Sequence, residues 1–247
     1  FLSQRISFDE KTQKEIYQYL SSYRLEDALD NEQSYYLKEA FKRVLYTLAI
    51  IPEGNGKLLE IGSNPYYMSM LIRKFTGYEL YFSNYFSTEY QGKRGIQYKI
   101  NDENGDKIGF QFDHFNIEGD DIPFEDGFFD VILFCEIIEH LIHDPMKALL
   151  NIKKMLRPDG YLIFSTPNIA RLENVAKLLV GENIYDPYSG YGPFGRHNRE
   201  YSKHELFLML TQLGFEIETM FTSDVAENFT DQIIHVSNFF DLVEYRK

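Results

Sequence analysis

One stretch, residues 127–168, constrains the fold more than any other part of the chain. It reads GFFDVILFCEIIEHLIHDPMKALLNIKKMLRPDGYLIFSTPN. Residues 129–134 and 161–165 are nearly continuous apolar runs, as strands buried on both faces of a parallel sheet require. Between them, residues 145–156 have the pattern of a helix, and a proline and a glycine follow it. A strand, a helix and a strand at this spacing predict a βαβ unit.

A second segment of the same kind precedes it. Residues 57–61 predict a buried strand, 62–65 a tight turn and 66–75 a helix, and 79–84 predict another strand. Residues 95–112 predict a β-hairpin inserted into this frame. The alternation of strands and helices predicts an α/β fold with a doubly wound, mostly parallel, Rossmann-like sheet. Ligands of such sheets bind beyond the carboxyl ends of the strands.

The flanking regions predict a helical N-terminus and an extended loop. Residues 1–50 show apolar residues at helical spacing, so we expect 1–52 to form a cap or lid and 53–247 to form the α/β domain. Residues 181–200 are rich in Gly, Pro, Tyr and Asn and predict a loop that covers the substrate.

Three shorter predictions concern the C-terminal part of the chain. Residues 170–180 predict a helix, and Ser202 is expected to cap another that runs to Leu213. Residues 215–221 predict a strand. For residues 230–243, helical spacing is slightly better than a strand pattern, and the assignment stays open.

Composition excludes several classes of partner. The net charge of −13 disfavours binding to nucleic acid. A single cysteine, Cys135, rules out an intrachain disulfide and suits a reducing compartment, so a cytoplasmic location is expected. No apolar stretch is long enough to span a membrane, and no signal peptide is visible. The chain begins at Phe1, so residues upstream are expected to be missing, and the oligomeric state stays open.

The turn after the first predicted strand, Glu60-Ile61-Gly62-Ser63-Asn64-Pro65, carries the first candidate site. Gly62 allows a ligand to approach the backbone closely. The following helix start offers free N–H groups. A carboxylate at Glu60 suits a cationic ligand and not a phosphate, and the G-x-G-x-x-G fingerprint of dinucleotide sites is absent.

This turn resembles the first motif of the class I S-adenosylmethionine-dependent methyltransferases, type 11/23-like, in which an acidic residue precedes x-Gly-x-Gly. The segments FNIEGDDIPFEDGFFDVILFCEIIEHL and LRPDGYLIFSTPN resemble later motifs of the same family. The resemblance implies S-adenosylmethionine as methyl donor and S-adenosylhomocysteine as product. It implies cofactor contacts at Glu60, Gly62, Ser63, Asn64, Asn84, Asn116, Ile117, Cys135 and Glu136.

Two positions depart from the family pattern. Asn64 replaces a glycine, and asparagine tolerates left-handed backbone better than most residues. Asn84 replaces the acidic residue that holds the ribose hydroxyls, so a charged hydrogen bond is lost. Each contact also has a structural alternative: Glu60 could cap the helix, Asn116 could form a turn, Glu136 could be a solvated carboxylate, and Cys135 is expected to pack in the core.

The resemblance also directs attention to histidines. An oxygen acceptor with a high pKa needs a base, and His140 and His197 are the candidates for that catalytic role. Arg196, Arg199 and Tyr201 are expected to bind an anionic acceptor; their alternative role is to hold the loop in place. His140 and His143 have metal-ligand spacing, but no carboxylate or thiolate completes a set, so no metal is expected.

The layout STPN followed by H-x-R-E-Y resembles bacterial methyltransferases of surface-polysaccharide and small-molecule pathways. It implies a sugar, nucleotide-linked, phosphorylated or phosphoramidate-type hydroxyl of a glycan precursor as acceptor. Three alternatives stay open: N-methylation, a binding protein that keeps the fold without activity, and an NAD-dependent oxidoreductase. The last is disfavoured by Glu60 and by the missing glycine.

Overall fold

The computed structural model describes residues 8–26, 30–188 and 192–225. Backbone contacts divide the chain into two compact units. The sheet unit comprises residues 1–137 and 143–165, and the C-terminal unit comprises 138–142 and 166–247.

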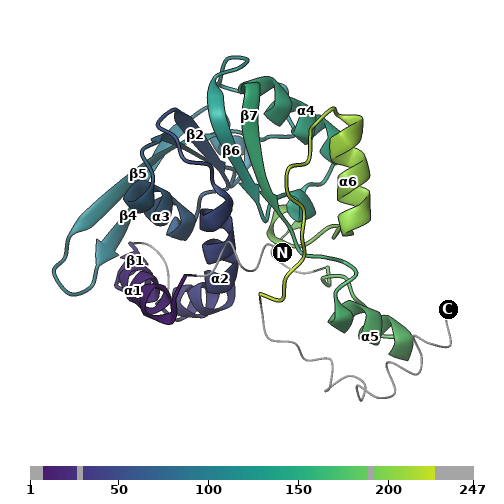
Figure 1. The fold of residues 1–247 in the computed structure, drawn as a ribbon, viewed down its shortest axis with the longest axis horizontal. Helices are drawn as coiled ribbons and strands as arrows, with labels where there is room; N and C mark the ends of the chain where they lie inside the picture. Colours follow the sequence, from purple (N-terminus) through teal and green to yellow (C-terminus); the bar gives the residue numbers. More distant parts are fainter. Residues whose placement is uncertain (1–7, 27–29, 189–191, 226–247) are drawn as a thin grey trace. The chain divides into compact units, whose positions relative to one another are not determined.

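The sheet unit contains a seven-stranded sheet in the order β1-β4-β5-β3-β2-β6-β7 (Figure 1). The strands are β1 (Tyr23–Leu25), β2 (Lys57–Ile61), β3 (Glu79–Asn84), β4 (Arg94–Asn101), β5 (Lys107–His114), β6 (Phe129–Cys135) and β7 (Leu156–Ser165). The β5-β3-β2-β6-β7 neighbours pair in parallel, whereas β4 pairs antiparallel with β5 and with β1. The carboxyl ends of β2, β3 and β6 therefore meet at one edge, as predicted for a Rossmann-like sheet.

The helices of this unit are α1 (Glu10–Ser21), α2 (Asp30–Ile50), α3 (Tyr67–Phe75) and α4 (Pro145–Met155), with a short 3-10 turn η1 (Thr88–Tyr90). Helix α2 packs against α1 and α3, and α4 packs against β7. Leu37 and Val44 of α2, Met70 and Leu71 of α3, and Leu58 of β2 share one buried apolar core. Burial of this apolar face, more than intrinsic propensity, holds the helices in place.

The C-terminal unit contains η2 (Ile138–His140), α5 (Leu172–Val180), η3 (Pro193–Gly195) and α6 (Lys203–Gln212). Helix α5 ends at Gly181, whose φ of 82° is the left-handed conformation that glycine adopts readily. Ser202 is the N-cap of helix α6, and its hydroxyl accepts a hydrogen bond of 3.2 Å from the Glu205 N–H. Both helices were predicted from the sequence.

Three sequence-based predictions about secondary structure need correction or extension. Residues 23–25, expected to be helical, form β1 at the sheet edge. The predicted hairpin exists, but β5 also pairs in parallel with β3 at Ser83 and Asn84, so it belongs to the main sheet. The strand predicted at 215–221 is absent, because nothing in the described chain pairs with it. Residues 230–243 lie outside the described part.

A lid function for residues 1–52 stays a prediction. Among the described residues, no helix combines the length and apolar character needed to cross a lipid bilayer.

Candidate functional site

Glu60 is the last but one residue of β2, and its carboxyl group is almost completely buried at 7% exposure. The Ser69 hydroxyl of α3 donates a hydrogen bond to its Oε2. Burial raises the pKa of Glu60 to about 8, against a smaller lowering by the Ser69 bond. A buried carboxyl of this kind ionises more readily when a positive charge comes close.

The turn after β2 depends on Gly62. Its φ is 72°, and its N–H donates to the Ser83 carbonyl at 2.8 Å. A Cβ placed on Gly62 would lie 2.1 Å from Cδ1 of Ile137, so no larger residue fits while Ile137 keeps its position. The second left-handed residue of this turn is Tyr66, with φ of 68°. Asn64 does not take that conformation, contrary to the role expected for it.

Asn84, at the end of β3, holds the same turn together. Its Oδ1 accepts hydrogen bonds from the Asn64 N–H at 3.0 Å and the Ser63 hydroxyl at 3.4 Å. Its Nδ2 donates to the Tyr66 hydroxyl at 2.9 Å. That hydroxyl donates in turn to Oε1 of Gln97 on β4, at 2.7 Å. The residue predicted to contact a ribose is thus 4% exposed and braces the loop.

Glu136 follows β6 in a left-handed conformation, with φ of 57°. Such backbone is uncommon for a residue with a side chain and marks strained, often functional positions. Arg43 of α2 donates to its Oε2 at 2.6 Å, and the Ser165 hydroxyl donates to its Oε1 at 2.8 Å. The carboxylate is therefore fixed in place. For its neighbour Cys135, burial raises the pKa to about 12, which suits a packed, unreactive thiol.

Asn116 and Ile117 lie in the segment that follows β5. The Asn116 Oδ1 accepts from the Glu118 N–H at 2.9 Å, which is the turn chemistry weighed as the alternative for this residue. Ile117 is buried, and its carbonyl accepts from Nδ2 of Asn151 at 2.9 Å. Contact of either residue with a cofactor stays a prediction.

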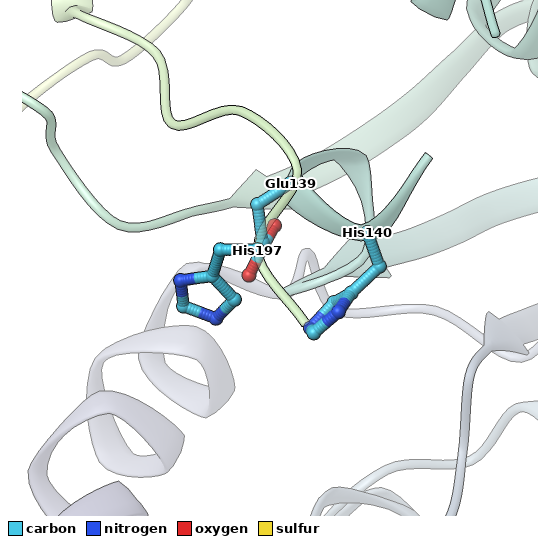
Figure 2. Close-up of side chains that lie close together, drawn as sticks. All are labelled: Glu139, His140 and His197. Carbon is cyan, nitrogen blue, oxygen red and sulfur yellow. The ribbon is translucent and has the colours of Figure 1, made fainter. Parts of the chain in front are cut away.

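In the C-terminal unit, the predicted catalytic histidines lie side by side. The ring centroids of His140 and His197 are 4.9 Å apart at an interplanar angle of 80°. Glu139 joins them: one ligand atom of each of the three residues lies within 4.8 Å of the others. Figure 2 shows the Glu139 carboxylate between the two rings. Spacing along the chain pairs His140 with His143, and it does not indicate Glu139.

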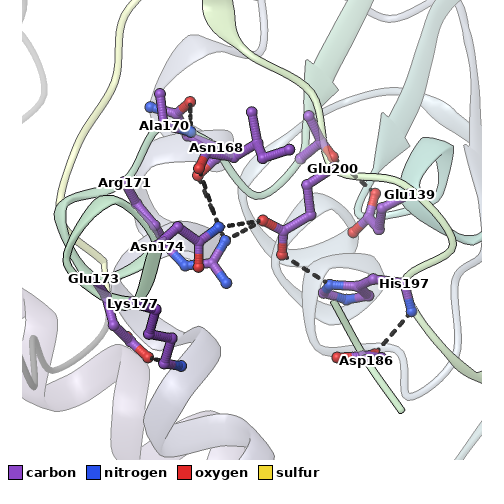
Figure 3. A network of polar contacts seen from close by, with 12 residues as sticks. Glu139, Asn168, Ala170, Arg171, Glu173, Asn174, Lys177, Asp186, His197 and Glu200 are labelled. Atoms are coloured by element: carbon purple, nitrogen blue, oxygen red, sulfur yellow. Dashed lines mark hydrogen bonds and ion pairs between the residues drawn. The ribbon is translucent and has the colours of Figure 1, made fainter. Parts of the chain in front are cut away.

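A polar network fixes His197 (Figure 3). Its Nδ1 lies 3.2 Å from Oε1 of Glu200, and Glu200 Oε2 accepts hydrogen bonds from Arg171 and, at 3.1 Å, from Asn174. The bond to Glu200 raises the pKa of His197 despite partial burial. Burial raises the pKa of Glu200, but the bonds from His197 and Arg171 outweigh it and the pKa is lowered. The pair is an ionised carboxylate that orients an imidazole.

The three predicted acceptor-binding residues are engaged within the C-terminal unit. Arg196 donates through Nε to Asn198 at 3.0 Å and lies 4.4 Å from the Tyr188 ring centroid. Arg199 forms an ion pair with Glu205. Tyr201 is 3% exposed. These contacts match the loop-anchoring alternative, and anion binding stays a prediction.

Comparison with known proteins identifies the class. Residues 31–220 match the family model described as "Methyltransferase domain". The match covers well over half of the chain, which therefore belongs to this methyltransferase family. Its cofactor is S-adenosylmethionine, as the sequence resemblance implied.

Curated relatives match a shorter part of the chain. The Ubiquinone biosynthesis O-methyltransferase of Rickettsia canadensis (strain McKiel) is 32% identical over 106 residues, which are 40% of this chain and 42% of that protein. The protein of the same name from Rickettsia conorii is 32% identical over 99 residues, covering 38% of this chain and 32% of that one. The chain thus matches less than half the length of these relatives.

A solved structure shows the same fold. It is a complex between the Haloferax volcanii Trm112 methyltransferase activator and a methyltransferase, with a TM-score of 0.52 and 15% identity. The alignment covers 91% of this chain and 93% of that chain. At this identity, the likeness concerns the fold alone.

The residues at the strand ends fit the cofactor of the family. S-adenosylmethionine carries a sulfonium and an ammonium group, and the buried Glu60 carboxyl is a suitable partner for a cation. Gly62 has no Cβ, and Cδ1 of Ile137 lies 2.1 Å from the position that a Cβ would take. The chemistry of the donor set therefore agrees with the family assignment.

Proposed function

We propose that this protein transfers the methyl group of S-adenosylmethionine to a hydroxyl oxygen of a small acceptor. The pairing of His197 with Glu200 is the observation that carries the proposal, because an oxygen acceptor must lose a proton and an oriented imidazole accepts one. The names of the curated relatives, which are O-methyltransferases, point to the same acceptor atom.

On the cofactor side, the residues of the sheet unit bind and orient the methyl donor. Glu60 is proposed to pair with its ammonium group, and Gly62 to admit it close to the backbone. Ser63, Asn64 and Asn84 form a turn that their mutual hydrogen bonds hold in place. Asn116, Ile117, Cys135 and Glu136 are proposed to complete the cofactor surface.

On the acceptor side, the histidines of the C-terminal unit handle the proton. The Glu200 carboxylate accepts from the His197 Nδ1–H, so that Nε2 carries the lone pair. In the metal-free protein, that nitrogen takes the proton of the acceptor hydroxyl. The oxygen then forms a bond to the methyl carbon while the C–S electrons return to sulfur, giving S-adenosylhomocysteine. His140 is proposed to share in this step, and Arg196, Arg199 and Tyr201 in holding the acceptor.

The acceptor is proposed to be a small polar molecule. The expectation of a surface-polysaccharide precursor rests on the sequence resemblance alone, whereas the curated relatives are named for ubiquinone biosynthesis. Both classes offer a hydroxyl group. An assay with a panel of catechols, sugars and sugar phosphates, followed by mass spectrometry of the product, would distinguish them.

Ligand binding tests the assignment before any acceptor is known. S-adenosylhomocysteine should raise the melting temperature of the protein, whereas NAD should not. The E60Q variant should lose most of that stabilisation, and E79Q, which changes an exposed carboxylate at the start of β3, should keep it. Equal stabilisation of wild type and E60Q would contradict the cofactor role of Glu60. Methylation of an amine in place of a hydroxyl would contradict the proposed acceptor.

A further inference from the structure

Glu139, His140 and His197, here called the Glu-His-His cluster, bring together more polar groups than a general base requires. A single imidazole suffices as a base, yet the structure assembles two imidazoles and a carboxylate within 4.8 Å of one another (Figure 2). Two of the three come from η2 and the third from the loop 57 residues further along. The fold of the C-terminal unit brings them together.

We propose that the Glu-His-His cluster binds one divalent transition-metal ion. Two imidazole nitrogens and one carboxylate oxygen form a ligand set that is established for zinc in catalytic sites. Magnesium and calcium prefer sites made of oxygen atoms only, so the donor set favours zinc or a neighbouring transition metal. Three protein ligands leave at least one coordination position for a water molecule or a substrate oxygen.

The hydrogen bonds around the cluster match those of metal-binding histidines. The Nδ1–H of His140 donates to the Arg196 carbonyl, the two atoms being 3.0 Å apart, and the Nδ1–H of His197 donates to the Glu200 carboxylate. Each ring therefore presents the lone pair of Nε2 for coordination. Partners of this kind fix the tautomer and the orientation of metal-binding imidazoles.

The carboxylate is held in the same way. Glu139 is completely buried, and its Oε2 accepts a hydrogen bond of 2.9 Å from the Thr166 hydroxyl. Its backbone carbonyl accepts from the Asn198 N–H at 2.7 Å, which ties η2 to the loop that carries His197. Asn198 also donates through Nδ2 to the His140 carbonyl at 3.0 Å. Hydrogen bonds thus fix the positions of all three ligand residues.

A bound cation would change how the acceptor loses its proton. With both Nε2 atoms coordinated, neither histidine acts as a base. If the acceptor hydroxyl took the open position, the cation would lower its pKa and its proton would leave to solvent. The deprotonated oxygen would then form the bond to the methyl carbon, and the C–S electrons would return to sulfur. This part of the inference rests on the proposed methyltransferase function, whereas cation binding itself does not.

Titration of the metal-stripped protein with Zn²⁺ by calorimetry, and with Co²⁺ by visible absorption, tests the inference. We expect one cation per chain and a cobalt spectrum typical of mixed nitrogen and oxygen ligands. H140A and H197A should each weaken binding by more than roughly 100-fold, because even the loss of an outer hydrogen-bond partner costs 10–100-fold. H204A removes an exposed histidine from α6 of the same unit and should bind like wild type.

Circular dichroism of each variant checks that it is folded. Wild-type affinity in a folded H140A/H197A double variant, or no binding by the wild-type protein at micromolar concentrations, would overturn the metal site. Stabilisation by S-adenosylhomocysteine, measured on the same metal-stripped protein, separates the two proposals. Binding of the nucleoside without the cation leaves the methyltransferase function intact. Binding of the cation without binding of the nucleoside would support the metal site and contradict the methyltransferase function.

Discussion

Oε1 of Glu200 lies 3.2 Å from Nδ1 of His197, while Oε2 of the same carboxylate is held by Arg171 and Asn174. One carboxylate thus connects the loop that carries His197 to helix α5 (Figure 3). The arrangement gives the imidazole a defined tautomer in the metal-free protein and in a metal-bound form alike.

The E200Q variant tests this connection. A carboxamide has the shape of the carboxylate but lacks its charge, so the imidazole loses basicity and a fixed orientation. We expect turnover to fall by about 10–100-fold. The affinity for S-adenosylhomocysteine should stay the same, because the predicted cofactor residues belong to the sheet unit. Steady-state kinetics and calorimetry measure the two quantities. The matched control is E173Q, which changes a carboxylate of α5 paired with Lys177. Turnover in E200Q equal to that of E173Q would contradict a role of Glu200 in orienting His197.

Cofactor binding should depend on pH through Glu60. Burial raises the pKa of Glu60 to about 8, so the carboxyl is largely protonated at neutral pH in the free protein. The ammonium group of the nucleoside pairs better with the ionised carboxylate, so the affinity should rise between roughly pH 6 and pH 8, by at most about tenfold per unit. Isothermal titration with S-adenosylhomocysteine measures this. In E60Q, any pH dependence of the affinity comes from the ligand alone. If the affinity of the wild-type protein changed with pH in the same way, Glu60 would not be the titrating group.

Gly62 should tolerate no side chain. In G62A, the left-handed φ of 72° and the clash with Ile137 act together, and we expect a loss of roughly 1–3 kcal/mol of unfolding free energy along with nucleoside binding. Gly105, in the hairpin turn, provides the matched control. Its φ is 74°, and nothing lies within 4 Å of an added Cβ. G105A therefore measures the cost of the left-handed backbone alone. The difference between the two variants in the free energy of unfolding by urea gives the cost of the clash with Ile137. Equal losses would mean that Ile137 simply moves aside.

Lys99 should make stability depend on pH. Its ammonium group is completely buried near Gln33 and lies 4.0 Å from the Tyr67 ring centroid; burial lowers its pKa to about 7. The unfolded chain keeps the ordinary value near 10.5 and so binds a proton that the folded protein lacks. The contribution of Lys99 to the free energy of unfolding therefore rises between about pH 7 and pH 10.5, by at most about 1.4 kcal/mol per pH unit.

The K99M variant removes this contribution. It should be more stable than wild type at pH 7, and the difference should shrink as the pH rises toward 10.5, because the unfolded chain then also begins to lose the proton of Lys99. Denaturant unfolding at several pH values provides the measurement. K74M is the control, since Lys74 is exposed and also lies over an aromatic ring, that of Tyr19, at 3.9 Å. A stability difference between K99M and wild type that does not vary with pH would show that Lys99 stays charged in the fold.

The parts of the fold that local pattern determines could be predicted from the sequence. The apolar runs around 129–134 and 161–165 and the Ser202 cap gave the βαβ unit and α6, because period and capping chemistry are local properties. The three residues of β1 are too few for any period to be recognised. The alternation at 215–221 resembles a strand, but a strand also needs a neighbour, and the sequence does not say where one lies.

Several residues of the candidate site could be predicted from the sequence, but the contacts between them could not. His140 and His197 were singled out separately, whereas Glu139 and Glu200 were missed. The signal for Glu200 was local: it lies three residues after His197. The approach of Glu139 and His197 depends on how the loop folds back onto η2, which spacing along the chain does not encode. Asn84 is predicted to face a ligand, but its bracing of the turn after β2 could not be predicted, because its partners Ser63, Asn64 and Tyr66 lie about 20 residues earlier in the chain.

Strand β1 has a consequence beyond the sheet that it extends. It covers part of the backbone of β4, the eight-residue outer strand of the hairpin, whose Ile96 side chain is 53% exposed. An open strand of that length offers a template on which other chains polymerise into fibrils, whereas a three-residue border is too short for such templating. Strand β1 thus covers the backbone of residues 99–101 at this edge, and deletion of residues 1–27 should increase aggregation of the protein, which light scattering would measure.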